Sequence, residues 1–437
     1  MKMNFKIPWF FGAILFVLPM VCSCRHSAAP ETQIGPEVNA PPIRQTEQVE
    51  KIEQVEQIET LVAEAVKKSG GLVARDAKTG RITEVDVAAN RSSVDDAAFS
   101  AIVQLTGLKK LSLSGGSLSE ESLKKLESLR SLEELLLVDT ITTDDDLAAL
   151  CRNLKNLRRL TLRRLTKLSD QGLKSLHSLK ELRNLALLNL PIGGPGLESV
   201  TSLSSLRALD LRGCNQLNSE DYLLLTKMTA LTDLKIGGTS INADVLRTVA
   251  TLPNLSGLTV EDATVTVDLW EELFANPRWS ENMTSLAFAR MYSVSDRVLE
   301  KLANFKKLKS LSLRAAPVRG SFVRNLPADS PLLANLQTLG MTKNYATPEE
   351  IFQLKQFKNL KKLDFSVTPM TLEKIEALST LDQIEVLMLA ECQLTDELVE
   401  KLVPLQNLSV LEIDNNPSLT DKTQETLKRF PKLNASM

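Results

Sequence analysis

The sequence is poor in the residues on which most enzymes and small secreted domains depend. Its 437 residues include two histidines, five cysteines and 4% aromatic residues. Two histidines leave little material for histidine-based catalysis, and the cysteine spacing fits neither a disulfide framework nor a zinc site. A large excess of one charge is also lacking, because the net charge is −2. This balance gives no general attraction to nucleic acid or to an anionic membrane.

Leucine, in contrast, is abundant and unevenly distributed. Four leucines lie in residues 1–100 and 73 lie in residues 101–437. The apolar fraction of 43% is too high for a disordered chain, and the charged fraction of 24% is too high for a multi-span membrane protein. A bias of this kind predicts an internal repeat.

The N-terminus has the pattern of an export signal. Lys2 and Lys6 precede an apolar run over residues 7–21, which is too short to span a bilayer as a helix. The run ends in Val-Cys-Ser-Cys, which resembles a bacterial lipobox, and this resemblance implies cleavage before Cys24 and a lipid on its sulfur. Residues 1–23 are thus predicted to be the signal peptide of an exported, membrane-anchored lipoprotein of the bacterial cell envelope. An ordinary signal peptide or an uncleaved anchor is the alternative.

Two further segments precede the leucine-rich region. Residues 24–44 are predicted to be a proline-rich tether, because residues 25–43 hold four prolines and no helix or strand period. Residues 45–69 are predicted to contain an amphipathic helix. Its apolar positions share one face: Ile52, Val55, Ile58, Val62, Ala65 and Val66. This helix either caps the next domain, forms a stalk or binds a partner.

A pattern L-x-x-L-x-L recurs from residue 82 to the C-terminus at spacings of 24 to 28 residues. Most copies continue with a polar turn and a short helical pattern, for which Ser119, Ser169 and Thr395 are predicted N-caps. The first positions of the fourteen units are Ile82, Leu108, Leu132, Leu157, Leu182, Leu206, Leu231, Leu255, Met283, Leu308, Leu336, Leu360, Ile384 and Leu408.

One strand and one short helix cannot bury enough apolar surface to fold alone, so such units must stack side by side. Neighbouring strands lie about 4.8 Å apart whereas packed helices need about 10 Å. The strand side must therefore become the inner edge of a curved array.

The repeats resemble the leucine-rich repeat family, over residues ~72–437. Within it they are most similar to the ribonuclease-inhibitor-like and cysteine-containing repeats, as residues 206–225 illustrate, with Cys214 in the position after the strand and Cys392 in the equivalent one. The resemblance implies an α/β solenoid over residues 70–437. Its parallel sheet would line the concave face of a horseshoe, and short helices would cover the convex face. We expect Cys151, Cys214 and Cys392 to be buried thiols.

Strand alternation predicts which side chains face the concave side. The middle row is mostly small and neutral, so it lacks the arginine or lysine stripe of a nucleic-acid binder, and we expect no nucleic-acid partner. The row consists of Asp86, Ser112, Leu136, Thr161, Ala186, Asp210, Lys235, Thr259, Ala287, Ser312, Gly340, Asp364, Met388 and Glu412.

Two groups on this face are candidate anchors for a partner, with a mixed solvated face as the alternative. The first combines the charges of the fourth, sixth and seventh units, namely Arg158, Arg159, Arg163, Arg164, Asp210, Arg212, Asp233 and Lys235. The second is the apolar patch Val386, Met388 and Ala390. A third candidate is Trp279, in the insertion over residues 275–283. Residues 327–335 form a second insertion. Insertions in repeat proteins often form binding loops, and the alternative is that the added loop length is simply tolerated.

The sequence therefore predicts a non-enzymatic, monomeric binding module without cofactor or metal. Its partner would be a protein or an envelope polymer bound on the concave face. A scaffold that assembles a complex through the helix over residues 45–68 is the first alternative, and a substrate-recruiting subunit of an enzyme complex is the second.

Overall fold

The computed structural model describes residues 43–88, 94–115 and 120–433. The predicted signal peptide, Cys24, Ser119 and the tether up to residue 42 lie outside the described residues. The fifteen strands form one sheet in sequence order, in which β1 is antiparallel to β2 and β2 to β15 are parallel. The strands are β1 (Leu72–Arg75), β2 (Ile82–Asp86), β3 (Lys110–Ser114), β4 (Glu134–Val138), β5 (Arg159–Arg163), β6 (Asn184–Leu188), β7 (Ala208–Asp210), β8 (Asp233–Gly237), β9 (Gly257–Glu261), β10 (Ser285–Ala289), β11 (Ser310–Arg314), β12 (Thr338–Gly340), β13 (Lys362–Asp364), β14 (Val386–Met388) and β15 (Val410–Glu412).

Short helices connect the strands on the outer side, and several continue as 3-10 turns. The α-helices are α1 (Ile43–Lys68), α2 (Asp96–Ile102), α3 (Glu120–Lys125), α4 (Asp144–Asn153), α5 (Asp170–Leu173), α6 (Gly194–Val200), α7 (Ala243–Ala250), α8 (Val267–Phe274), α9 (Pro277–Asn282), α10 (Asp296–Leu299), α11 (Pro331–Asn335), α12 (Pro348–Gln353), α13 (Leu372–Leu378), α14 (Asp396–Glu400) and α15 (Asp421–Leu427). The 3-10 helices are η1 (Leu126–Ser128), η2 (Lys174–Ser178), η3 (Asp221–Lys227), η4 (Glu300–Asn304), η5 (Ser321–Asn325) and η6 (Leu354–Gln356).

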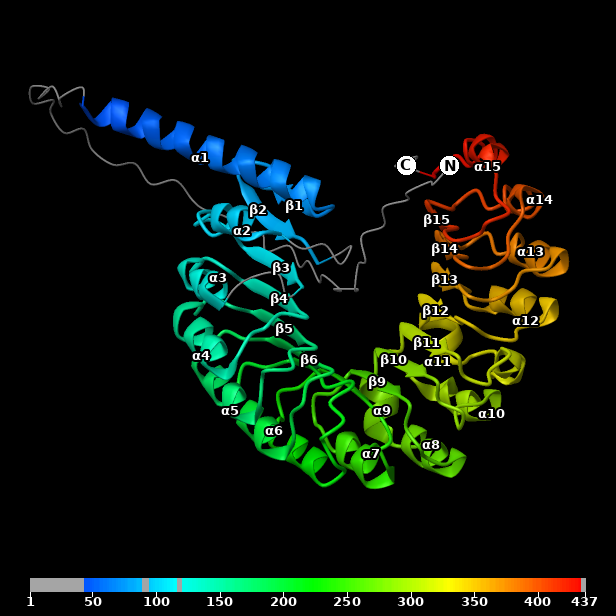
Figure 1. Ribbon diagram of the computed structural model, residues 1–437. Coiled ribbons are helices and arrows are strands. Elements are labelled where there is room, and N and C mark those ends of the chain that lie inside the picture. Colours follow the sequence, from blue (N-terminus) through cyan, green and yellow to red (C-terminus); the bar gives the residue numbers. More distant parts are fainter. Residues whose placement is uncertain (1–42, 89–93, 116–119, 434–437) are drawn as a thin grey trace, which may run out of the picture.

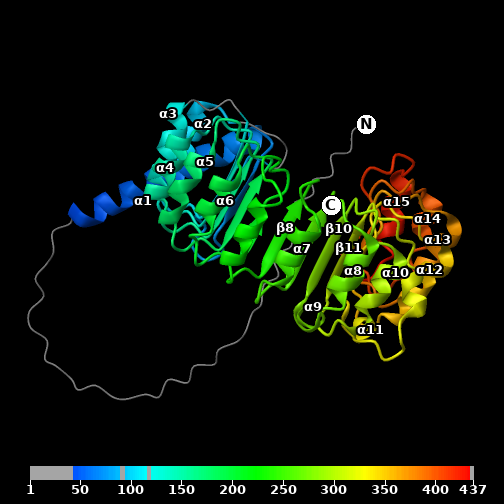
Figure 2. The same ribbon diagram turned by 90° about the horizontal axis from the view of Figure 1, so that it is seen from below.

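The array curves into a horseshoe with strands on the concave side and helices on the convex side (Figure 1), which confirms the predicted fold class. Figure 2 shows that the two halves of the array do not lie in one plane. The predicted caps are present where they are described: the Ser169 and Thr395 side chains accept hydrogen bonds from the backbone of Gln171 and Leu398.

The predicted register of the concave face is confirmed in every unit. Each residue of the predicted middle row is the pairing partner of the next one, from Asp86 opposite Ser112 to Met388 opposite Glu412. The leucines of the pattern point the other way and form one continuous core. In the sixth unit, for example, Leu206, Leu209 and Leu211 are at most 1% exposed.

A turn with left-handed backbone follows the strand in every unit whose turn is described. In thirteen units, the residue seven positions after the first position of the unit has this left-handed backbone, as Asp139, Arg164 and Val367 do. In eleven units its N–H donates to a carbonyl of the next unit, for example from Arg164 to the oxygen of Leu188 at 2.9 Å. Non-glycine residues adopt this backbone at a cost of order 1 kcal/mol. The added inter-unit hydrogen bond helps to offset that cost and places these side chains in a row along the edge where the strands end.

The helix predicted over residues 45–69 is present as α1, and its second half covers the first unit (Figure 1). Val62 and Val66 are fully buried against the array, whereas Val55 is 39% exposed, so only part of the predicted apolar face is used. Glu59, 5% exposed, is ion-paired to Arg75 at 2.6 Å and accepts a hydrogen bond from the Ile82 N–H at 3.2 Å. The helix thus closes the N-terminal end of the core.

Candidate partner-binding surface

The charged residues in the centre of the concave face are largely occupied by one another. Arg212 bonds to both oxygens of Asp210, at 2.9 and 2.7 Å, and reaches Glu261 of β9 at 3.2 Å. Glu261 also pairs with Arg290 at 3.0 Å. Hydrogen bonding to Asp210 raises the pKa of Arg212 above its ordinary value, so the guanidinium stays charged. This chain of charges ties the units together and leaves little of Asp210 or Arg212 for a partner.

Asp233 and Lys235 follow on the neighbouring strand β8. Asp233 is partly buried because its carboxylate lies over Gly257, where a Cβ would stand 2.3 Å from the Asp233 Oδ2. Burial raises the pKa of Asp233, and the nearby Lys235 and Arg212 partly oppose this. The structure therefore brings the predicted residues of the sixth and seventh units together.

The arginines of the fourth unit are engaged mainly with the third unit. Arg159 pairs with Glu134 at 2.5 Å, and Arg164 pairs with Asp139 through a bond of 2.6 Å from Nε. Arg163 ends β5 with an exposed side chain. These ion pairs are cross-strand contacts at the surface, where each contributes at most about 1 kcal/mol.

Trp279 is not a surface residue, which corrects its prediction as a partner anchor. It lies in α9, is 1% exposed and packs against Phe274 with ring centroids 6.3 Å apart. The second insertion likewise forms a helix, α11, that buries Leu332 and Leu333. Large apolar side chains in both insertions gain more from joining the core than from forming an exposed loop.

The predicted apolar patch near the C-terminal end remains accessible. Val386 and Met388 on β14 are half-buried, and the neighbouring Val410 on β15 is 49% exposed. Val410 pairs directly with Val386 in the sheet. Sequence reasoning missed Val410, although the register that placed Val386 on this face places Val410 beside it.

Carboxylates flank this patch without salt bridges. Asp364 and Glu412 are the middle-row neighbours of Met388 on either side, and Asp414 follows two residues after Glu412. In the part of the chain that the structure describes, none of these three lies within salt-bridge distance of a lysine or arginine. Burial raises the pKa of Glu412 and of Asp414. We name the group Asp364, Val386, Met388, Ala390, Val410, Glu412 and Asp414 the C-terminal concave surface.

Two exposed tyrosines lie beyond the strand ends in the same half of the array. Tyr292 is 83% exposed and Tyr345 is 69% exposed, and each stands nine residues after the first position of its unit. The chain has only three tyrosines, and two of them occupy the same position in the ninth and eleventh units. This coincidence was a signal in the sequence that sequence reasoning did not use. Exposed tyrosines are typical of contact surfaces.

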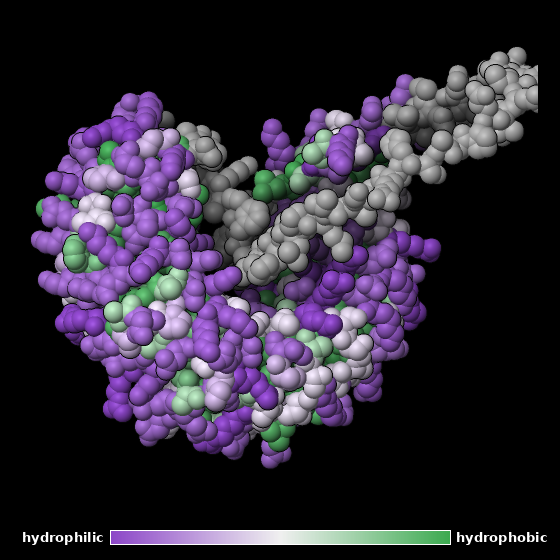
Figure 3. All heavy atoms as spheres, turned by 180° about the vertical axis from the view of Figure 1, so that it is seen from behind, coloured by the Kyte–Doolittle hydropathy of each residue, from purple (hydrophilic) through white to green (hydrophobic). Residues whose placement is uncertain are grey.

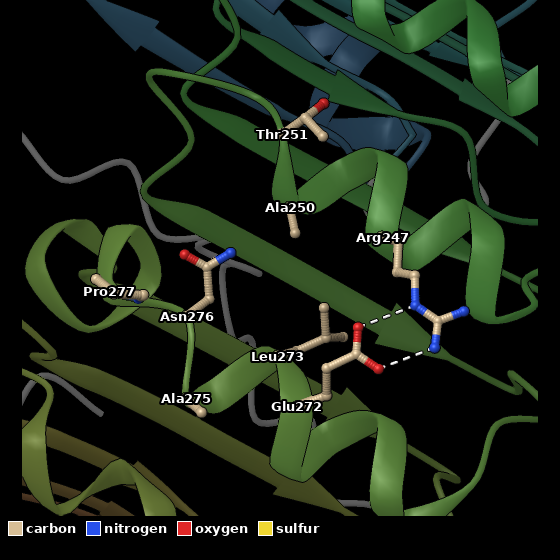
Figure 4. Close-up of a pocket in the computed structure, with 8 residues that line it drawn as sticks. All are labelled: Arg247, Ala250, Thr251, Glu272, Leu273, Ala275, Asn276 and Pro277. Atoms are coloured by element: carbon tan, nitrogen blue, oxygen red, sulfur yellow. Dashed lines mark hydrogen bonds and ion pairs between the residues drawn. The ribbon is translucent and has the colours of Figure 1, made fainter.

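Clefts between helices on the convex side are weaker candidates for a binding site than the concave surface. One cleft, of about 420 Å³, lies between α7 and α8, and Figure 4 shows the Arg247 and Glu272 side chains that line it bonded to each other. Their two hydrogen bonds, of 2.9 and 2.8 Å, neutralise the only charges that line it. Figure 3 shows hydrophilic side chains over most of the face that it views, with apolar ones in scattered groups.

The described cysteines are poor nucleophiles. Cys151, Cys214 and Cys392 are buried and unpaired with one another, and burial raises the pKa of each thiol to about 11. Among residues 43–88, 94–115 and 120–433 no group of three or more His, Cys, Asp or Glu is arranged to hold a metal. None of the helices described has both the length and the apolarity needed to cross a bilayer.

Comparison with known proteins supports the fold. No family model matches the chain, and no curated protein matches its sequence. Among solved structures, the complex of Rad7 and Elc1 in yeast contains a chain that is 16% identical with a TM-score of 0.55, covering 90% of this chain and 94% of that one. This protein therefore has a leucine-rich repeat fold.

Two further solved structures are similar over much of their length. An internalin (inlF) from Listeria monocytogenes is 20% identical with a TM-score of 0.40, covering 87% of this chain and 96% of that one. TLR13, in a complex with ssRNA13, is 21% identical with a TM-score of 0.45, covering 78% of this chain and 54% of that one.

Proposed function

We propose that this protein is a monomeric, non-enzymatic binding module that takes a protein partner on its C-terminal concave surface. The observation that carries this proposal is an accessible apolar centre, Val386, Met388 and Val410, flanked by carboxylates that form no salt bridge with any residue the structure describes. Elsewhere on the concave face, the charges of the central units already pair with one another.

The chemistry of the surface favours a segment with an apolar side chain next to a lysine or arginine. A cation placed between Glu412 and Asp414 would relieve the cost of holding two partly buried carboxylates close together. The same carboxylates repel phosphate, so we do not propose a nucleic-acid partner. An envelope polymer remains the second candidate.

The partner is sought by crosslinking and pull-down from the native envelope with the intact chain. We expect Met388→Glu to abolish capture, because it places a charge in the apolar centre. Ala186→Glu is the matched control, since Ala186 occupies the same middle row in the fifth unit. Capture that is equal in both variants contradicts this site. Captured material that survives proteolysis identifies a polymer instead of a protein.

We also propose that the chain is an exported lipoprotein of a bacterial envelope, anchored through Cys24. The lipobox-like segment behind an apolar run supports this. Radiolabelled palmitate should enter the protein, persist in Cys22→Ala and vanish in Cys24→Ala. Absence of label in the parent protein contradicts the anchor and leaves the concave site untouched.

The adaptor alternative depends on α1, whose packing decides how it must be tested. Deleting residues 45–68 would uncover the core, because Val62 and Val66 are buried under this helix. Leu61 is 60% exposed on the same helix, so Leu61→Asp probes a partner while the cap stays in place. Loss of capture in Leu61→Asp, with capture retained in Met388→Glu, would favour the adaptor.

A further inference from the structure

Six exposed cations gather at the edge of the sheet where the strands of the third to sixth units begin. We name them the basic edge: Arg130, Arg152, Lys155, Lys180, Arg183 and Arg207. Arg130, Lys155 and Lys180 each stand two residues before the first position of three consecutive units, and the units stack at strand spacing. The repeat thus aligns them in one column.

A second column consists of arginines that follow the first position. Arg183 donates its backbone N–H to the Arg158 oxygen at 2.9 Å, and Arg207 donates to the Arg183 oxygen at 2.8 Å, so these three lie side by side directly before β5, β6 and β7. Like charges directly beside each other across strands are destabilising. The fold does not need them, because Thr232, Ser256 and Thr284 hold this position in the next three units.

The nearby carboxylates form no salt bridge with these cations in the described parts of the chain. Glu133 is taken by Lys109 at 3.0 Å and by Arg158 at 3.8 Å, and Glu127 accepts a bond from Asn153 at 2.6 Å. Glu181 is exposed and is the remaining acid on this edge of the fifth unit. No salt bridge to any of the six cations is found within the described parts of the chain.

Backbone carbonyls engage only part of the basic edge. Lys155 donates to the Cys151 oxygen at 3.0 Å, and Arg207 donates to the Ser204 and Leu206 oxygens at 3.2 and 3.0 Å. The Lys155 contact suits a cation near a helix C-terminus, here that of α4. The side chains of Arg130, Arg152, Lys180 and Arg183 have no such contact among the described residues.

The cations also border an open hollow of about 400 Å³ lined by Arg130, Arg152, Asn153, Lys155 and Asn156. Its wall is held in place because the Asn156 side chain donates to the Arg130 oxygen at 2.9 Å. The hollow therefore offers three cations to a phosphate group. A net charge of −2 for the whole chain conceals this local excess.

We propose that the basic edge binds the anionic phospholipid surface of the membrane to which the chain is tethered. The choice of a membrane rests on the proposed lipid anchor at Cys24, and α1 covers the first unit, in the same N-terminal half of the array as the units that carry the basic edge (Figure 1). Clusters of four to eight lysines and arginines bind anionic lipid headgroups, and a basic patch is a second signal that strengthens anchoring.

The test uses the full chain carrying Cys24→Ala, so that no acyl chain contributes, and vesicles of phosphatidylcholine with or without phosphatidylglycerol. We expect binding only to the mixed vesicles, weakening as salt rises. Arg183→Ser with Lys180→Ser should lower the affinity roughly thirty-fold, since each cation near an anionic surface contributes about a five-fold gain. The double variant Arg314→Ser with Lys343→Ser removes two exposed cations at the opposite edge and should bind as the parent does.

Equal binding to both kinds of vesicle, or an equal loss in the two double variants, overturns the proposal. So does binding to polyglutamate or to single-stranded RNA without binding to the mixed vesicles, which would assign the edge to another polyanion. Palmitate labelling tests the lipid anchor separately from the basic edge. Label at Cys24 with no vesicle binding supports the anchor and contradicts lipid binding by the basic edge. Vesicle binding without label supports lipid binding by the basic edge and contradicts the anchor.

Discussion

Arg212, two residues after β7, and Glu261, at the end of β9, join two units that are not neighbours through an ion pair of 3.2 Å that passes over β8. The residue of β8 in register with Glu261 is Gly237, which has no side chain to stand in the way. Three units of the repeat are thus connected at the point where the middle one has a glycine.

Gly237→Ala should destabilise the protein by about 1–3 kcal/mol. A Cβ at this position would lie 2.6 Å from the Glu261 Cγ and 2.9 Å from its carbonyl oxygen, so backbone and side chain must both shift. Urea unfolding measures the loss. Gly107→Ala is the control, because a Cβ there meets nothing within 4 Å, and a similar loss in both variants would contradict the close approach at residue 237.

Glu59→Ala should release α1 from the first unit. The substitution leaves the Ile82 N–H and the Arg75 guanidinium without their partner, at a cost of about 1–3 kcal/mol. Because each repeat contacts only its neighbours, we expect faster amide exchange in β1 and β2 and little change beyond the third unit. Glu64→Ala, at an exposed position of the same helix, should leave exchange unaltered. Unchanged protection of β2 in Glu59→Ala would show that the cap does not depend on this carboxylate.

Leu211→Asp should unfold several neighbouring units. Leu211 is fully buried and its N–H donates to the Lys235 oxygen of the next unit at 2.9 Å, so a charge there disrupts two units at once. Circular dichroism melting should show a large loss of cooperative signal. Leu223→Asp, in the same unit but 48% exposed, should melt within a few degrees of the parent. A parent-like curve for Leu211→Asp contradicts the register.

The C-terminal concave surface should make stability depend on pH. Burial raises the pKa of Glu412 above its ordinary value of 4.5, so the folded state holds this proton more tightly than the unfolded chain does. That contribution is present at low pH and is lost as the pH rises through the raised pKa. We therefore expect Glu412→Gln to raise the melting temperature at pH 7 and to have less effect near pH 4. The control is Glu121→Gln, which makes the same change of charge at an exposed residue of α3. If Glu412→Gln and the control change the melting temperature equally at both pH values, the buried Glu412 charge does not destabilise the protein.

Cys214 should resist alkylation until the array unfolds. Burial raises the pKa of its thiol to about 11, and its Sγ lies 3.1 Å from the Leu187 oxygen. Iodoacetamide at pH 8 should label it in urea and label it far more slowly in native buffer. Rapid labelling under native conditions means that this part of the ladder opens readily.

Much of the frame could be predicted because the repeat imposes it. Side chains alternate between the core and the concave face along each strand, and the units stack in register. These two rules predict the fourteen first positions, the middle row of the concave face and the buried thiols. The left-handed turns escaped prediction, because residues as different as Asp139, Ala315 and Val367 occupy them. In eleven of the thirteen units that backbone is accompanied by a hydrogen bond to the next unit, whatever the residue type.

The candidate site was harder to predict, since it depends on which exposed groups find partners. Trp279 was expected at the surface because it lies in an insertion, but it is buried and packs against Phe274. Asp210 and Arg212 were expected to meet a partner, and they meet each other.

The sequence by itself determined the solenoid, its curvature and the side of the sheet on which every strand residue lies, because periodicity is a local property that each unit repeats. Only the tertiary structure decided which charges remain uncompensated. Glu134 and Arg159 neutralise each other across adjacent strands, while Arg183 stands beside two arginines. An ion pair joins residues about 25 positions apart through a particular stagger of units, so no reading of one unit reveals it. The two surfaces proposed here, one acidic and apolar and one basic, are what those pairings leave exposed.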